Sequence, residues 1–394
     1  MSGTVAEKKG AGGAGTGAGG AGSAGGAGGA GRERVLSRRG IAVTGGFAVA
    51  AVLLVLVPSF TDSFYTFVAT RMLLLGLFAT AYNTVFGFGG MSSLGHAAFF
   101  GIGGYTVGIA VTRWDWPPLV VLTVAVVLGA AVAAVFGVMC LRVRGIYLLL
   151  LTLALAQAIA GLAFYQTEWT GGDNGIPNIP RDGLPSSVRE GDGYYMLTLV
   201  VVAVCVALLW MYQRSPLGMS VVGVRESEAR MSATGYRTGR LRVVAFTVSG
   251  AFSAVAGVLE VYLQGSVSTA NMSWLISADV LVFAILGGAR HFLGPFLGAV
   301  MVTGLEVWVS TYTDRWTTVL GIVYIATALF LADGILGRAG WAVGRAKSWR
   351  EKKSSPPGRA AAPDGGAAGP GGSGAGPGSG PGSGSGGVPA EVGA

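Results

Sequence analysis

Long apolar runs are the feature that most constrains what this chain can fold into. A helix needs roughly 17–25 mostly apolar residues to cross the hydrocarbon core of a membrane. Because helices satisfy their own backbone polar groups in lipid, runs of this length favour a helical bundle. We therefore predict an all-α, polytopic fold of about ten transmembrane helices, at 41–57, 64–86, 92–112, 117–140, 145–165, 194–213, 243–264, 275–289, 292–312 and 316–333.

The two ends of the chain differ in composition from the part between them. Residues 1–31 are rich in Gly and Ala, and residues 354–394 are rich in Gly, Pro and Ser. Such segments cannot bury enough apolar area to offset their chain entropy, so we predict two disordered tails. The remaining membrane domain, 32–353, is poor in charge, since only 12% of the whole chain is charged against roughly 25% in soluble proteins.

Positive charge is distributed unevenly among the segments that connect the runs. With the N-terminus inside, the inside segments carry 19 Lys and Arg residues and the outside segments carry four. An excess of Lys and Arg marks the cytoplasmic side of a membrane protein. This pattern predicts that both termini are cytoplasmic. It also explains the net charge of +8 without a nucleic-acid partner.

Two connecting segments are long. The outside segment, 166–193, is acidic and rich in turn residues, and we do not expect it to fold alone. The inside segment, 214–242, is basic, and Ser215-Pro216 is a typical start signal for a helix. This segment has mixed charge, so it is either a solvated linker or a docking element for a cytoplasmic partner.

Small and polar residues within the runs suggest how the helices pack. Small residues recur at helical spacing, for example at Gly129, Ala133 and Gly137, which predicts close helix packing. Polar residues inside a membrane are costly, and usually face the interior or a cavity. Each is either a packing hydrogen bond or a contact along a path. The candidates are Asn83, Ser92, Ser93, His96, Gln157, Glu260, Asp279 and Glu306.

Two further expectations concern these polar residues. Ser92 and His96 lie four residues apart and are expected on one helix face. The three acidic residues lie near predicted outside ends, so we expect their side chains to snorkel to water. Arg71 interrupts the second run, and we expect it either to pair with an acidic neighbour that the sequence does not identify or to line the interior.

The motifs of catalysis and of metal or nucleotide binding are missing. None of the five lysines lies in a GxxxxGK[ST] motif, so this chain is not expected to bind ATP in a P-loop. No HExxH or GxSxG motif occurs, and His96 and His291 are the only histidines. Cys140 and Cys205 lie in apolar runs and are expected to be small buried residues. We predict no catalytic residue, no metal site and no cofactor on this chain.

Three stretches, in order along the chain, resemble one family of transporters. They are YNTVFGFGGMSSLGHAAFFGIGGYTVGIA at 82–110, RGIYLLLLTLALAQAIAGLAFYQTEWTGGDNGIP at 144–177, and a third that runs from SPLGMSVVGVRESEARMSATGY to LGGARHFLGPFLGAV at 215–300. Together they place the resemblance over about 70–335. The family is that of the LivM-type permeases of branched-chain amino-acid ABC importers.

The resemblance implies partners that the chain itself lacks. A permease of this family pairs with a homologous permease, is driven by two cytoplasmic ATPase subunits that bind ATP, and receives its substrate from an external solute-binding protein. It implies that the inside segment 214–242 docks the ATPase through Arg225, Glu226, Ser227, Glu228, Ala229 and Arg230. The expected substrate path is lined by Asn83, Ser92, Ser93, His96 and Gln157.

Two alternative functions stay open at this level. A permease of the same family could carry urea or short amides instead of branched-chain amino acids. An ion-coupled secondary transporter would use Asp279 or Glu306 as its proton or sodium site and would need no ATPase. All of these functions place the protein in the cytoplasmic membrane, with several spans.

Overall fold

The structure is a computed structural model that describes residues 55, 58, 62–181, 183–189 and 191–330. The predicted tails at 1–31 and 354–394 lie outside the described residues, and so does the predicted span at 41–57 apart from residue 55. Their assignments stay predictions.

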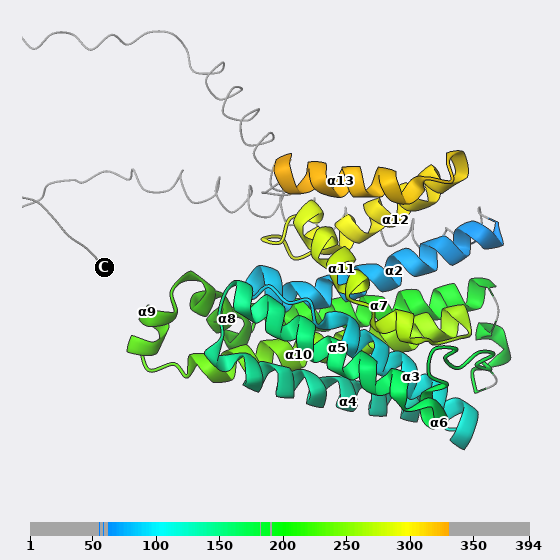
Figure 1. Cartoon of the computed structure of the whole chain (residues 1–394), viewed down its shortest axis with the longest axis horizontal. Coiled ribbons are helices and arrows are strands. Elements are labelled where there is room, and N and C mark those ends of the chain that lie inside the picture. Colours follow the sequence, from blue (N-terminus) through cyan, green and yellow to red (C-terminus); the bar gives the residue numbers. More distant parts are fainter. Residues whose placement is uncertain (1–54, 56–57, 59–61, 182, 190, 331–394) are drawn as a thin grey trace, which may run out of the picture. The chain divides into compact units, whose positions relative to one another are not determined.

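Helices make up most of the described chain, and each predicted span from residue 64 onward coincides with one of them (Figure 1). The long helices are α2 (Ser63–Asn83), α3 (His96–Trp114), α4 (Pro118–Met139), α5 (Ile146–Tyr165), α7 (Gly191–Arg214), α10 (Thr238–Gln264), α11 (Trp274–Gly287), α12 (Gly294–Tyr312) and α13 (Trp316–Phe330). The described part holds no strand, only one isolated antiparallel bridge between Ile176 and Val267. The all-α class is confirmed.

Short helices occupy the connections. They are α6 (Thr167–Thr170), α8 (Pro216–Glu226) and α9 (Glu228–Ala233), the 3₁₀ turns η2 (Cys140–Arg142), η3 (Ser186–Val188) and η4 (Thr269–Met272), and one π-helix, η1 (Thr84–Phe88), that continues α2. π-helical turns are rare in proteins, and those that occur are often found at functional sites.

Five helical segments of the described chain are long and apolar enough to cross a membrane. They are Ser63–Phe88, Pro118–Arg142, Ile146–Tyr165, Gly191–Arg214 and Thr238–Gln264. Trp274–Gly287 and Trp316–Thr327 are apolar but shorter. The predicted count of about ten spans and the cytoplasmic position of both termini therefore stay predictions.

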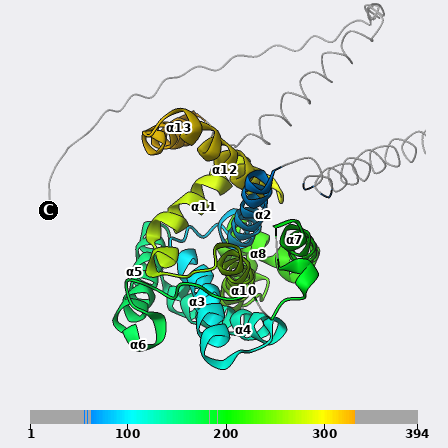
Figure 2. The same cartoon turned by 90° about the vertical axis from the view of Figure 1, so that its right-hand side faces the viewer.

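Helix α10 packs against α2, α3 and α4 (Figure 2). Small residues bring α4 and α10 close together, since a Cβ atom built on Gly129 would lie 2.6 Å from the Cβ atom of Ala254. A Cβ atom on Gly137 would lie 2.9 Å from the Cα atom of Val243. The predicted small-residue packing is confirmed on this face, where only glycine lets the two backbones approach.

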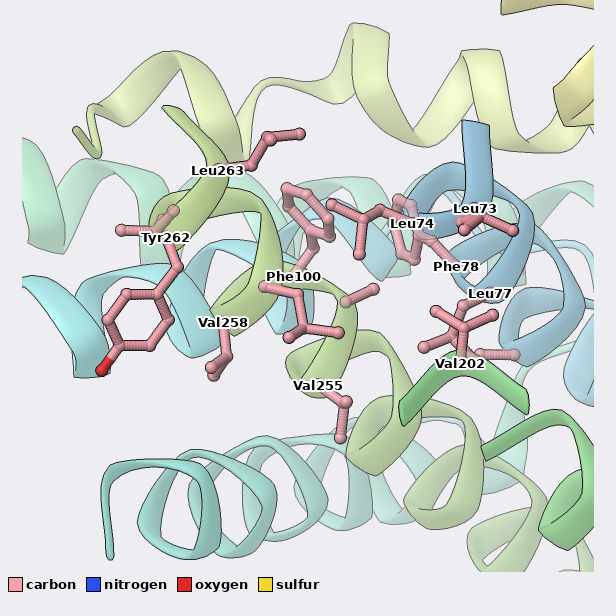
Figure 3. Packing of buried hydrophobic residues seen from close by; sticks show 14 of the residues in the cluster. Leu73, Leu74, Leu77, Phe78, Phe100, Val202, Val255, Val258, Tyr262 and Leu263 are labelled. Carbon is pink, nitrogen blue, oxygen red and sulfur yellow. The ribbon is translucent and has the colours of Figure 1, made fainter. Parts of the chain in front are cut away.

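Large apolar side chains from α10 and three helices beside it pack into one buried cluster (Figure 3). In lipid, such a core is held by dispersion and shape rather than by exclusion of water, so close packing carries most of its stability. The labelled members come from α2, α3, α7 and α10, and are Leu73, Leu74, Leu77, Phe78, Phe100, Val202, Val255, Val258, Tyr262 and Leu263.

Candidate functional site

The chain between α2 and α3 is an interruption of regular helix in the interior of the bundle. Residues 89–95 are not helical, and most of them are buried. The side chain of His96, the first residue of α3, contacts Ser249, which lies eleven residues after the start of α10. Ser249 therefore lies about 16 Å from the start of α10, measured along the helix axis. Non-helical backbone at such depth is tolerated only inside protein or beside a water-filled cavity.

Hydroxyl groups from other helices satisfy the amides of this interruption. The Leu94 N–H donates to Thr152 Oγ1 of α5 at 3.1 Å, and the Ala97 N–H donates to Ser277 Oγ of α11 at 2.9 Å. The Gly95 N–H donates to Ser93 Oγ at 3.2 Å. The segment leading into α3 is therefore tied to α5 through Leu94, and a first-turn amide of α3, that of Ala97, is capped by α11.

A relay of hydrogen bonds runs through His96, which is fully buried. Its Nδ1 atom lies 3.1 Å from Ser93 Oγ, and its Nε2 atom lies 2.9 Å from Ser249 Oγ. Ser249 donates its own proton to the Ala81 carbonyl at 2.7 Å. Ser249 must then accept from His96, so the neutral ring carries its proton on Nε2 and accepts from Ser93 on Nδ1. The relay joins α2, α3 and α10.

The other predicted path residues lie in different surroundings. Asn83 is fully buried, with Nδ2 at 3.5 Å from the His291 carbonyl, and Ser92 is half-buried. Gln157 is exposed on α5 and lines a shallow groove of about 300 Å³. The other residues of this groove are Ala160, Gly161, Phe164, Thr269, Ser273 and Trp274. The structure thus brings Ser93 and His96 together and places Gln157 elsewhere; a path along all five residues stays a prediction.

Arg71 lies between two acidic residues on two other helices. Its Nε atom is 4.0 Å from Oε1 of Glu260 in α10, and its Nη1 atom is 3.9 Å from Oε1 of Glu306 in α12. The snorkelling expected for Glu260 is wrong, because this residue is only 4% exposed and turns toward Arg71. Asp279 accepts a hydrogen bond from the Tyr324 hydroxyl at 3.3 Å. No group of three or more His, Cys, Asp or Glu among the described residues could hold a metal ion.

The inside segment 214–242 folds into α8 and α9. Ser215 caps α8 by accepting from the Gly218 N–H at 3.3 Å, which confirms the predicted start signal. Ser227 separates the two helices and caps α9 by accepting from the Arg230 N–H at 3.4 Å. Val221 and Val224 are buried in one apolar cluster with Val85 and Met91, so α8 packs onto the end of η1.

The six predicted docking residues divide into two groups. The Arg225 guanidinium donates to the Gly87 carbonyl at the end of η1. The Glu228 carboxylate accepts from Arg242 and from Thr238 Oγ1, the latter at 3.2 Å, and lies 2.9 Å from the Arg144 guanidinium. Glu226, Ala229 and Arg230 are exposed, and Ser227 is half-buried. Arg225, although it is also exposed, and Glu228 therefore hold the segment to the helices, while Glu226, Ala229 and Arg230 are exposed and can meet a partner.

Several residues that build these contacts were not identified from the sequence. Thr152, Ser249 and Ser277 are isolated hydroxyls in apolar runs, and no local pattern marks them. Arg181, in the outside segment, donates to the carbonyls of Tyr262 and Leu263 at 2.5 and 2.8 Å and so caps the end of α10. Such a cap joins residues about 80 positions apart, which spacing along the chain does not reveal.

Comparison with known proteins shows which family and which relatives the chain resembles. Residues 64–331 match the family model described as branched-chain amino acid transport system / permease component. The chain is 28% identical to the high-affinity branched-chain amino acid permease LivM of Escherichia coli over 68% of this chain and 69% of that protein. It is 30% identical to the autoinducer 2 permease LsrC of Klebsiella pneumoniae over 54% of this chain and 62% of that one. It is 22% identical to the ribose permease RbsC of Haemophilus influenzae, over 57% and 71%.

No solved structure matches the chain. The family model nevertheless covers more than half of the sequence, including the interruption before His96, the inside segment and the Arg71 cluster. The chain belongs to the family of branched-chain amino acid transport system permease components.

Proposed function

We propose that this protein is the permease subunit of an ABC importer that carries branched-chain or other hydrophobic amino acids across the cytoplasmic membrane. The observation that carries the proposal is the family match over 64–331. The alignment with LivM supports the amino-acid substrate, because it covers more of the chain than the alignments with LsrC or RbsC.

The proposal assigns ATP to partner subunits. The chain has no P-loop motif, so two cytoplasmic ATPases would bind and hydrolyse ATP. A homologous permease would complete the path, and an external solute-binding protein would deliver the substrate. The relatives are permeases by name, and an importer permease depends on such partners.

The exposed face of α8 and α9 is the proposed site of ATPase docking. Glu226 and Arg230 present charges of both signs there, and Ala229 between them leaves room for a close contact. Glu228 has a different role in this proposal, because its carboxylate is held by Arg144 and Arg242. It fixes α9 against α10 so that a push on the docking face is passed on to the helices.

Substitutions at the two glutamates separate these roles. We expect Glu226→Lys to reduce co-purification of the ATPases while the permease keeps its thermal stability. Glu228→Lys places a third positive charge beside Arg144 and Arg242, so it should lower the stability of the permease itself. Normal uptake in both variants would contradict the docking assignment.

The whole assignment is tested by purification from native membranes followed by reconstitution. The permease should bring with it ATPase subunits and a binding protein, and the ligand of that protein identifies the substrate. In proteoliposomes the chain alone should not transport, and uptake should need ATP and all partners. Uptake by the chain alone, driven by a proton or sodium gradient, would establish the ion-coupled alternative instead.

The same preparation tests the proposed path. Cysteine introduced at the exposed Gln157 should react with a small polar thiol reagent if the groove that it lines is part of the path, and should stay unreactive if that face meets lipid. Cysteine at Ser92 or His96 should react only when substrate and ATP drive the cycle. Complete protection of both in every state would remove them from the path and leave the His96 relay a packing element.

A further inference from the structure

The end of η1 is capped by a residue from the inside segment. Gly90 and Met91 return their N–H groups to the carbonyls of Phe86 and Val85 at 3.0 Å each. The Gly87 carbonyl accepts instead from the guanidinium of Arg225, at the end of α8. A cation is favourable at this place, because the C-terminal end of a helix carries partial negative charge.

Gly90 makes room for the stem of Arg225. It is exposed and has a φ of +67°, and a Cβ atom at this position would lie 2.6 Å from Arg225 Cγ. A side chain at residue 90 would therefore both strain the backbone and displace the arginine. The mostly buried stretch that leads to His96 begins at the next residue, Met91.

Apolar contacts make the same connection beside the hydrogen bond. Val221 and Val224 of α8 are 2% and 7% exposed, and they share a cluster with Val85 before the interruption and Met91 within it. This cluster also contains Phe99 of α3. Movement of α8 thus cannot leave residues 85–91 in place without breaking packing on both sides of the interruption.

We propose that Arg225 is a positioning residue for transport, which ties the position of the docking helix α8 to the interruption between α2 and α3. The inference rests on the proposed function, since it assumes that ATPases act on α8. When the ATPases move α8, Arg225 carries the end of η1 with it, and residues 89–92 shift relative to the His96 relay. The guanidinium of Arg225 is the polar part of this coupling beside the apolar cluster, and without Arg225 ATP use moves the interruption less effectively.

The test uses the complete reconstituted transporter, with the ATPases that co-purify with the native chain. Arg225→Gln keeps most of the stem and removes the cation. We expect the ATPases to remain bound, ATP hydrolysis to stop responding to the loaded binding protein, and uptake to fall about tenfold, the size typical of losing one charge-assisted hydrogen bond. Arg225→Lys restores a donor and should keep uptake within about threefold of the native chain.

Two controls separate coupling from general damage. Arg240 is an exposed arginine in the same basic region without a side-chain partner among the described residues, and Arg240→Gln should stay within about twofold of native uptake. Gly90→Ala should resemble Arg225→Gln. Gly265→Ala, at a φ of +71° with open space around it, imposes the same backbone strain far from Arg225 and should keep the coupling.

Three results would overturn the inference. Arg225→Gln could keep normal coupling, or it could lose the ATPases from the complex, which would make Arg225 a direct docking contact. Gly90→Ala and Gly265→Ala could also have equal effects on coupling, which would attribute them to strain alone. Failure of the proposed function would be visible separately, as a native chain that transports without any ATPase.

Discussion

Helices α2 and α10 are joined at two depths by clusters of opposite character. Around His96 the groups are neutral and paired at 2.7–3.1 Å, with Ser249 donating to Ala81 of α2. About 15 Å further along the helices, Arg71 faces Glu260 at 4.0 Å. There, Arg71 Nε and Glu260 Oε2 have no hydrogen-bond partner among the described residues.

The difference teaches how a membrane bundle combines a fixed point with an adjustable one. A buried neutral network in which every group is paired specifies one geometry, because any shift leaves a donor or acceptor unpaired. A charged pair held at 4.0 Å, with an unused donor and acceptor, can exchange partners without losing a well-formed hydrogen bond. We therefore regard the His96 relay as the fixed contact between α2 and α10, and the Arg71 cluster as the contact that can rearrange.

The largest expected effect is at the fixed contact. His96→Ala removes two hydrogen bonds and leaves a cavity among Tyr82, Phe99 and Phe246, whose rings surround the imidazole. We expect the free energy of unfolding in detergent to fall by about 4 kcal/mol. The control is His291→Ala, since His291 is exposed, and it should change stability by less than about 0.5 kcal/mol. Equal losses in the two variants would contradict the comparison.

A smaller effect is expected from Arg71. Arg71→Met leaves the buried Glu260 carboxylate without its cation, but the arginine side chain is 38% exposed and its ion pairs are long. We expect a loss of about 2 kcal/mol in the same measurement. The double variant Arg71→Met/Glu260→Gln removes the unpaired charge and should recover most of the loss. A double variant no more stable than the single one would show that Arg71 acts by packing alone.

The smallest effect is expected at the outer arm of the charged cluster. The Glu306 side chain is 26% exposed and lies 3.9 Å from Arg71. Glu306→Gln should therefore cost no more than about 0.5 kcal/mol. A loss as large as that of Arg71→Met would mean that this arm is as fixed as the His96 relay, and the distinction between the two clusters would fail.

The sequence was sufficient to predict the positions of the long helices, because the length of an apolar run can be measured along the sequence without knowing which residues it will contact. The apolar runs from residue 64 onward locate the nine long helices of the described chain to within about five residues, and Ser215-Pro216 locates the start of α8. It was less informative where a helix starts inside the bundle. The run predicted from 92 begins as helix only at His96, because the Leu94 amide donates to Thr152 of α5 instead of to a helical carbonyl, and Ser277 of α11 caps the first turn at Ala97.

Side-chain contacts between residues far apart in the sequence could not be predicted from sequence patterns. Glu226 and Glu228 are the same residue type two positions apart, yet one is exposed and the other is held by Arg144 and Arg242. The distinction arises from where α10 and the connection between α4 and α5 bring those arginines. In the same way, a local reading of the chain does not reveal that Arg71 meets Glu260 and Glu306.

The interruption before α3 also has a consequence for how the protein is made. Its amides at Leu94 and Ala97 are completed by Thr152 and Ser277, which the ribosome adds 58 and about 180 residues later. Until α11 has been synthesised, this backbone cannot rest in lipid with all of its polar groups paired. The centre of the bundle is thus completed late during biogenesis, only after α11 has been synthesised.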